Sequence, residues 1–364
     1  MHSFKIKEQK TVCEICPSEN NARNSEGDFI TLNDGRIMFS YSRYNSSGSE
    51  DDDSCDIAAL FSSDNGESFC DEKITVKAED FGVKNLMSVT LRRMNNGDLG
   101  LFFLKKEPNG NSEVILCRSK DEGETFYKRT RCIPATFPSY YVMNNCRVLR
   151  TESGKWFIPV ASHRKGTDID GEPDFDYYAF SLLYFSEDDG ETWNEIPHKF
   201  VNPAPHTETG LQEPGICELE NGTLYAYFRT DCMCQYESFS PDGGKSWTTA
   251  SPSQFTSPES PMLIRKNPYS GKYYAVYNPV PNYNGKEIPE DFFHGGRTPI
   301  VLRESENGID FSEEIIAIED NPHRGYCYPS MYFVDKNTML LSFCAGGRED
   351  GSCLNKTIIK KIII

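Results

Sequence analysis

Arginine, glutamate and tyrosine residues stand beside short apolar runs at equivalent points of a repeated pattern in this chain. A lone arginine is usually a surface charge and a lone tyrosine usually core, but buried arginine and glutamate are rare without a function. Several together at equivalent positions predict one polar pocket, in which the arginines could hold an anionic ligand. The candidates are Arg147, Glu213, Tyr326 and Tyr328 before apolar runs, and His163, Arg229 and Arg297 near the ends of neighbouring ones.

An acidic loop could add a proton donor to this pocket. Residues 48–54 contain three adjacent aspartates, Asp51, Asp52 and Asp53. A run of like charges is usually a solvated loop, and a polar channel can be filled with water and carry no chemistry. The functional interpretation is a flexible loop that carries one acid over a central site.

A turn motif recurs along the chain and predicts how these residues are positioned. Its pattern is Ser-x-Asp-x-Gly-x-Ser/Thr followed by an aromatic residue. Serine and aspartate close a tight turn, glycine supplies a positive φ, and the aromatic side chain anchors the next strand. The copies lie roughly 60 residues apart, which is the spacing of propeller blades. They begin at Ser62, Ser119, Ser186 and Ser240, with a degraded, shorter copy at Ser305.

A second repeat, a two-residue turn followed by an apolar run, lies between copies of the first. Asn-Gly or Asp-Gly between apolar runs is the strongest short-range signal of a β-hairpin. The six turns are Asp34-Gly35, Gly97-Asp98, Ser153-Gly154, Asn221-Gly222, Ser270-Gly271 and Lys336-Asn337.

Together the two repeats predict an all-β fold, a six-bladed β-propeller of four-stranded antiparallel blades. We expect residues 1–364 to form this single unit, although length alone suggests two domains. Segments 4–16 and 356–364 both resemble strands, and their pairing in one blade would close the ring and remove exposed edges. The alternative for the isoleucine-rich C-terminal segment is a partner-binding element. The first strand of each blade lines the channel, so the strand starts should ring one end of the axis.

Bulk composition excludes several classes of function. The 364 residues carry a formal net charge of −17, which argues against nucleic-acid binding and requires a local arginine cluster to hold any anion. The N-terminus lacks an apolar segment of signal-peptide length, and no run is long enough to span a membrane. The 13 cysteines lack zinc-like spacing, so we expect reduced thiols, no metal site and a cytoplasmic protein.

The repeated turn resembles the Asp-box of the sialidase superfamily, whose six-bladed fold matches the predicted blade count over nearly the whole chain. The stretch from Glu213-Pro214 to Arg229 resembles the segment with that family's catalytic glutamate and the second arginine of its carboxylate-binding triad. Gly296-Arg297 resembles the loop with the third arginine. Tyr328-Pro329-Ser330-Met331 resembles the family's Tyr-Ser-Ser-Leu segment, whose tyrosine is the nucleophile. The same general pattern occurs in uncharacterised bacterial propellers described only as sialidase-like.

Two positions depart from the family pattern. Arg23 stands where the first arginine of the triad should be, but the usual Arg-Ile-Pro is Arg23-Asn24-Ser25 here. The acid/base aspartate normally precedes the first Asp-box, where this chain has three adjacent aspartates. Of these we favour Asp52 or Asp53.

The resemblance implies a retaining exo-glycosidase acting on sialic acid or a related acidic sugar. Arg23, Arg229 and Arg297 would bind the substrate carboxylate in bidentate fashion. A neutral tyrosine is not repelled by that carboxylate, as a carboxylate nucleophile would be. Glu213 would take the proton of Tyr328, and a loop aspartate would protonate the leaving oxygen and later activate water. No metal or cofactor is implied.

Two other functions are compatible with the sequence. One is a hydrolase or lyase for oligosaccharides that contain uronic acid or a deoxy-sugar such as rhamnose, in which Arg147 or His163 would matter more. The other is a non-catalytic glycan-binding propeller, against which the joint presence of Glu213 and Tyr328 argues. In each case the expected partner is a small oligosaccharide or glycoside.

Overall fold

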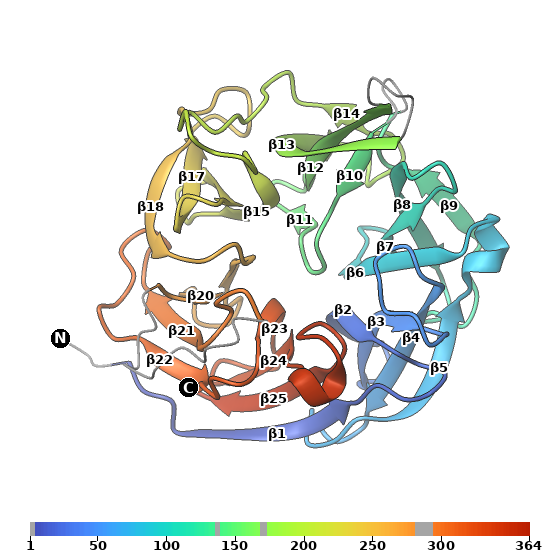
Figure 1. The fold of residues 1–364 in the computed structure, drawn as a ribbon. Coiled ribbons are helices and arrows are strands. Elements are labelled where there is room, and N and C mark those ends of the chain that lie inside the picture. Colours follow the sequence, from blue (N-terminus) through green and yellow to red (C-terminus); the bar gives the residue numbers. More distant parts are fainter. Residues whose placement is uncertain (1–3, 135–138, 168–172, 281–293) are drawn as a thin grey trace.

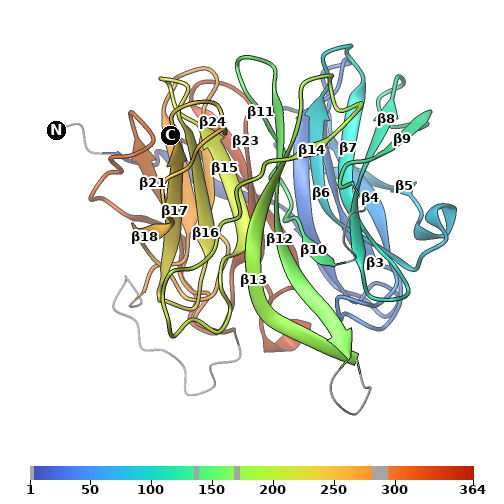
Figure 2. The ribbon, with the colours of Figure 1, turned by 90° about the horizontal axis from the view of Figure 1, so that it is seen from above.

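The structure, a computed structural model, describes residues 4–134, 139–167, 173–280 and 294–364. Within these ranges the chain is almost entirely β, and its helices are two short 3-10 turns, η1 (Ala78–Phe81) and η2 (Arg348–Asp350). The strands form sheets arranged as a propeller around a central axis (Figure 1). Seen at right angles, the strands run along that axis (Figure 2). The prediction of an all-β propeller is therefore confirmed.

Two sheets are four-stranded meanders whose strand order follows the chain. In both, the first strand lies innermost and the last outermost (Figure 1). One contains β15 (Gln212–Glu218), β16 (Leu224–Arg229), β17 (Cys234–Ser240) and β18 (Ser251–Thr256). The other contains β19 (Leu263–Lys266), β20 (Tyr273–Tyr277), β21 (Ile300–Ser305) and β22 (Ile316–Glu319).

The sheet before them has an innermost edge built from two short strands. Both β10 and β11 pair with β12, which continues to β13 and β14. Its strands are β10 (Tyr140–Val142), β11 (Leu149–Arg150), β12 (Trp156–Thr167), β13 (Pro173–Ser186) and β14 (Asn194–Glu195).

The N-terminal part of the chain forms one eight-stranded sheet with a weak point in its middle. The strands β4 and β6 are joined by a single parallel pair, Cys55 opposite Asn85. On one side of that pair lie β2 (Asn24–Thr31), β3 (Ile37–Tyr44), β4 (Cys55–Ser62) and β5 (Cys70–Val76). On the other lie β6 (Asn85–Arg93), β7 (Leu99–Lys106), β8 (Ser112–Ser119) and β9 (Lys128–Arg131).

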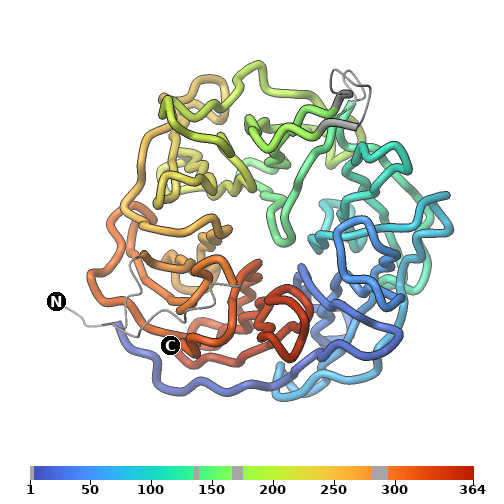
Figure 3. The backbone as a smooth tube through the Cα atoms, in the orientation of Figure 1, coloured from blue at the N-terminus to red at the C-terminus, as the bar shows by residue number. Residues whose placement is uncertain are grey.

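The last sheet contains strands from both ends of the chain. Its order is β1-β25-β24-β23, with β1 (Glu8–Ile15) antiparallel to β25 (Thr357–Ile363). The inner strands are β23 (Cys327–Phe333) and β24 (Thr338–Cys344). The segments of β1 and β25 accordingly run side by side along one edge of the molecule (Figure 3).

The hydrophobic core lies between neighbouring sheets rather than within any one of them. Phe102 of β7 packs in one cluster with Trp156 of β12 and Leu182 of β13. Another cluster joins Val276 of β20 to Leu341 of β24. Because each sheet is covered on both faces, its central strands are apolar on both faces, as the sequence runs indicate.

The predicted turns form by the expected contacts. At the third copy, the Gly190 amide donates to Ser186 Oγ at 2.8 Å, and Thr192 donates to Asp188 through its amide (2.9 Å) and hydroxyl (2.6 Å). Gly190 has φ 80°, and the Trp193 indole N–H donates to the Gly190 carbonyl at 3.1 Å. The same glycine-to-serine bond measures 2.8 Å at Gly66, Gly123 and Gly244, and 2.9 Å at Gly308.

These turns should make the stability of the protein pH-dependent in acid. Hydrogen bonds from Thr192 and Ser186 outweigh desolvation and lower the pKa of Asp188 to about 2, against about 3.9 in an unfolded chain. A carboxyl group whose pKa is lower in the folded protein than in the unfolded chain stabilises the fold fully at a pH above its unfolded pKa. That stabilisation is lost as the pH falls through its folded pKa. The urea midpoint of Asp188→Asn should therefore vary less between pH 5 and 2 than that of the wild type. Glu187→Gln, at the exposed neighbouring position, should keep the wild-type dependence, and equal slopes in all three proteins would contradict this account.

Candidate active site

Five non-glycine residues near one end of the axis adopt a left-handed backbone. In four innermost strands, β2, β6, β15 and β23, the pairing register shifts at this point, which marks a β-bulge. A bulge changes the direction of a side chain, and such strained positions cluster at functional sites. The residues are Glu26 (φ 56°), Ser88 (63°), Cys146 (63°), Glu213 (45°) and Tyr328 (52°).

Two of these residues, Tyr328 and Glu213, form a nucleophile–base pair. The Tyr328 hydroxyl donates a hydrogen bond to Glu213 Oε1 at 2.8 Å. Glu213 is buried, and Arg229 Nη1 lies 3.0 Å from its second oxygen. Burial opposes ionisation of Glu213, but the charges of Arg229 and Arg297 hold its pKa below the ordinary value. Burial and the charge of Glu213 raise the pKa of Tyr328 well above its ordinary value, so the pair rests as a neutral phenol and a carboxylate.

Two arginines flank this pair. The guanidinium of Arg297 lies 5.8 Å from the ring centre of Tyr328 and donates to the Glu259 carbonyl at 3.1 Å. Arg229 lies between two carboxylates, at 3.0 Å from Glu213 and 3.3 Å from Glu259. The structure thus brings four of the predicted residues together, namely Tyr328, Glu213, Arg229 and Arg297.

Arg23 forms a separate cluster in which its guanidinium is already occupied. Its side chain is only 2% exposed and contacts Glu26 Oε1 at 2.8 Å and Asp51 Oδ1 at 2.7 Å. Its Nε donates to Ser25 Oγ at 3.0 Å. Glu26 also accepts a hydrogen bond from the Ser88 hydroxyl. In the free protein, Arg23 therefore neutralises acidic side chains of its own chain.

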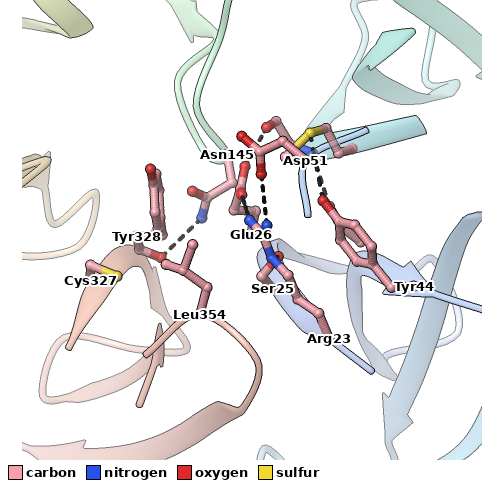
Figure 4. Close-up of polar contacts among 12 residues, drawn as sticks. Arg23, Ser25, Glu26, Tyr44, Asp51, Asn145, Cys327, Tyr328 and Leu354 are labelled. Atoms are coloured by element: carbon pink, nitrogen blue, oxygen red, sulfur yellow. Dashed lines mark hydrogen bonds and ion pairs between the residues drawn. The ribbon is translucent and has the colours of Figure 1, made fainter. Parts of the chain in front are cut away.

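The two clusters face each other across Asn145. Figure 4 shows Tyr328 on one side and Arg23 with Glu26 and Asp51 on the other. The Asn145 amide donates to the Tyr328 carbonyl at 3.3 Å and to the Gly27 carbonyl at 2.9 Å. The electrostatic influence of Glu26 extends to Tyr328, and that of Arg297 to Asp51. The clusters therefore belong to one electrostatic site.

The aspartate at this site is Asp51, whereas sequence reasoning favours Asp52 or Asp53. The Asp51 side chain is 55% exposed, and the charges of Arg23 and Lys106 lower its pKa to about 2. Asp53 instead accepts from the Glu50 amide at 2.9 Å and so closes its own loop. Asp52 borders a separate surface cavity that Lys106 also lines. Three identical adjacent residues carry no signal of which one faces inward, because the loop conformation decides it.

The remaining sequence candidates lie elsewhere. Tyr326 is 1% exposed and packs in the hydrophobic core against Phe343. His163 stacks on Phe175 at 5.0 Å between ring centres, and its Nδ1 lies 3.1 Å from the Asp176 carbonyl. Burial lowers the pKa of His163, and the charges of Glu213 and Arg229 still reach it. Arg147 is buried against other partners, the Tyr227 hydroxyl at 3.2 Å and the Met262 carbonyl at 2.7 Å.

Sequence reasoning missed Glu26 and Lys106 as parts of the site. Lys106 is buried and donates to the Asp51 carbonyl at 2.7 Å. Glu26 stands three positions after Arg23, a spacing that carries no meaning in a regular strand and becomes a contact only through the bulge. Among the described residues, no group of three or more His, Cys, Asp or Glu is arranged to hold a metal ion.

The Arg23 cluster should be a large contributor to stability. Removing one partner of a buried ion pair leaves an uncompensated charge and typically costs about 3–5 kcal/mol. Arg23→Met should lower the free energy of unfolding by about that amount, measured by urea denaturation. Arg43→Met is the matched control, because its partner Glu72 is 40% exposed and such pairs contribute about 0–1 kcal/mol. Equal losses in the two variants would show that Glu26 does not depend on Arg23 for its charge.

Comparison with known proteins shows which family this chain belongs to. Residues 41–340 match the family described as BNR repeat-like domain. No curated protein matches the sequence. Among the described residues, no helix has the length and apolar character needed to cross a membrane.

Solved structures with the same fold are distant in sequence. A protein of unknown function from Dyadobacter fermentans has a TM-score of 0.72 and 16% identity, with 99% of both chains covered. The Hadza microbial sialidase Hz136 has a TM-score of 0.64 and 18% identity over 93% of this chain and 65% of that one. Trypanosoma rangeli sialidase, in complex with 2,3-difluorosialic acid as a covalent intermediate, has a TM-score of 0.64 and 14% identity over 94% and 54%. The chain thus spans about two thirds and about half of the two sialidases. It belongs to the BNR repeat-like domain family and has the fold of the sialidase-like propellers.

Proposed function

We propose that this protein is a retaining exo-glycosidase that releases a terminal acidic sugar, sialic acid or a relative, from a small oligosaccharide or glycoside. The observation that carries the proposal is the 2.8 Å hydrogen bond from the Tyr328 hydroxyl to the buried carboxylate of Glu213. Binding alone needs no such pair, whereas covalent catalysis by tyrosine requires a base to take its proton. The covalent intermediate described for the Trypanosoma rangeli sialidase supports the same type of chemistry.

We further propose that residues 1–364 form one six-bladed unit closed by β1 and β25. The eight-stranded sheet would count as two blades, because only the Cys55–Asn85 pair joins its halves. A hydrophobic cluster also lies between those halves, with Met38 and Ile57 on one side and Leu99 and Leu101 on the other. The antiparallel pairing of β1 with β25 supports closure between the two ends of the chain.

In this mechanism the substrate carboxylate binds Arg229 and Arg297 beside Tyr328. The Tyr328 oxygen bonds to the anomeric carbon while the bond to the leaving oxygen breaks, and the phenol proton passes to Glu213. The leaving oxygen takes a proton from Asp51. Water then gives a proton back to Asp51 and attacks the anomeric carbon while the bond from that carbon to the Tyr328 oxygen breaks, and Glu213 returns its proton to the Tyr328 oxygen. Two displacements give retention of configuration.

To act as the acid, Asp51 must take up a proton when the substrate binds. In the free protein Arg23 and Lys106 hold the pKa of Asp51 at about 2, so this residue is a carboxylate at neutral pH. A substrate carboxylate placed among the neighbouring arginines is a like charge, and like charges raise the pKa of a carboxyl group. We propose Asp51 rather than Asp52 or Asp53 as the acid, because Asp51 is the aspartate that contacts Arg23.

A second candidate is a hydrolase or lyase for a uronic-acid or deoxy-sugar glycoside. The observation that favours it is the occupied guanidinium of Arg23, whose Nη atoms contact Glu26 and Asp51. Arg229 likewise contacts two carboxylates, those of Glu213 and Glu259, so fewer free arginines remain for an anionic substituent of the sugar than the three expected for sialic acid. A third possibility, a non-catalytic glycan-binding propeller, has no observation of its own in its favour.

The nucleophile is tested with Tyr328→Phe on fluorogenic α-sialoside and β-glucuronide substrates. We expect the wild type to turn over one of them and the variant to lose about 10³-fold or more in kcat/KM, because the attacking oxygen is absent. Tyr326→Phe is the matched control and should keep its activity, since Tyr326 lies in the core. Activity that survives in Tyr328→Phe would refute the mechanism. A folded wild type that hydrolyses neither substrate, nor a wider panel of acidic and deoxy-sugar glycosides, would refute the enzyme proposal.

The loop acid is tested by comparing leaving groups. A general acid matters most when the leaving oxygen is basic, so Asp51→Asn should lose about 10²–10⁴-fold on an alkyl glycoside. The loss should be much smaller on a nitrophenyl glycoside, whose leaving oxygen needs no proton. Asp52→Asn and Asp53→Asn should lose less than Asp51→Asn on the alkyl glycoside. The same loss on both substrates for Asp51→Asn would assign Asp51 a structural role beside Arg23.

A further inference from the structure

A second hollow opens on the axis at the end opposite to the candidate active site. Its cavity measures about 320 Å³ and is lined by the later parts of innermost segments, among them Arg147, Arg150, Arg265 and Lys266, and by Tyr227 of β16. A shallower cavity shares Arg265 and Lys266 with it and adds Arg92.

This hollow is distinct from the Tyr328 site. β15 carries both, with Glu213 near its start and Glu218, which lines the cavity, at its end. At about 3.3 Å per residue its seven residues span about 20 Å. The turn that follows β11 lies at one end of the molecule in the side view (Figure 2), and Arg150, the last residue of β11, lines the cavity there.

Two guanidinium groups in the hollow, of the buried Arg147 and the half-buried Arg265, contact no carboxylate among the described residues. Arg147 is 3% exposed and donates only to the Tyr227 hydroxyl and the Met262 carbonyl. Arg265 donates to the Cys146 carbonyl at 2.9 Å and sulfur at 2.6 Å. The buried Nε of each has no hydrogen-bond partner. Cations in the protein interior are normally paired with an acid, so the source of the counter-charge for Arg147 and Arg265 has to be identified.

The neighbouring acids offset only part of this positive charge, and the charge of Asp28, which contacts Arg92, also reaches Arg265. Of the two glutamates that line the cavity, Glu152 pairs with Lys266 at 3.2 Å, and Glu218 accepts the Glu152 amide at 2.7 Å. Arg92 contacts Asp28 at 2.7 Å, but burial and the adjacent charge of Arg265 lower its pKa. Positive charge therefore accumulates here, in a protein whose formal net charge is −17.

We propose that this far cavity binds a small anion with a phosphate or carboxylate group, held by Arg147 and Arg265, with Arg92 of the adjoining cavity adding positive charge. An oxyanion would supply a counter-charge to the guanidinium groups of Arg147 and Arg265, and guanidinium suits such anions because its donors are arranged in a planar fork. A volume of about 320 Å³ lies at the lower end of the range for small-molecule sites. The proposal does not depend on the glycosidase activity, since within the described parts of the chain these arginines form their hydrogen bonds and ion pairs with groups other than the side chains of Tyr328 and Glu213.

The proposal is tested by calorimetric titration of the intact protein with inorganic phosphate and with acetate, against chloride at the same ionic strength. We expect phosphate, acetate or both to bind above chloride, and the pattern identifies the anion class. Arg265→Gln should weaken binding about tenfold or more, the loss of one charged hydrogen bond. Arg297→Gln, at the other site, should leave phosphate binding within about twofold.

A second variant keeps the test decisive if Arg265→Gln does not fold. Arg150 lines the same cavity and its side chain is exposed, so Arg150→Gln should fold and weaken binding by a few fold through the loss of local charge. Failure of both anions to bind above chloride would overturn the proposal. So would binding that Arg265→Gln and Arg150→Gln leave unchanged or that Arg297→Gln abolishes.

Discussion

The candidate site depends on a local break in the regular geometry of the innermost strands. An unbroken strand directs its side chains alternately to its two faces, and in this fold both faces are buried against neighbouring sheets. A bulge with a left-handed residue interrupts that alternation at the same point of several strands, at Glu26, Glu213 and Tyr328 among others. Such a conformation costs about 1 kcal/mol or more per non-glycine residue. The packing between the sheets holds these residues in place and presents their polar groups toward the axis.

Once these side chains share a small space, their charges determine each other's protonation. Arg229 and Arg297 keep Glu213 ionised despite its burial, while the charge of Glu213 helps to keep Tyr328 a neutral phenol. Environments that push the pKa values of paired groups apart assign them as acid and base. Arg23 does the same for Asp51 on the opposite side. Two of these cations contact a buried acid directly, Arg229 that of Glu213 and Arg23 that of Glu26.

The features that were predicted well from the sequence are the repeated ones. Local residue chemistry predicts the turn at Ser186 and its equivalents, and also the hairpins between them. The same residue types recur in each copy, so each copy supports the prediction. The equivalent places of Glu213 and Tyr328 before apolar runs predict a shared pocket, and the resemblance to the sialidase superfamily predicts their pairing. Single features were less predictable. Tyr326 and Tyr328 stand two positions apart, but one packs in the core and the other faces the axis, because a bulge separates them. Nothing in the sequence distinguishes Asp51 from its two neighbours, since only the loop conformation does.

Arg147 shows most clearly how backbone geometry separates residues that the sequence places together. It follows Asn145 by two positions, and in a regular strand the two would point the same way. The left-handed Cys146 between them breaks that rule. Asn145 contacts the backbone of Tyr328 and Gly27 at the site, whereas Arg147 contacts Tyr227 and Met262 beside the far cavity. One strained residue thus lets a three-residue segment contribute to two separate polar centres. Any movement of this segment would change the position of side chains at both centres.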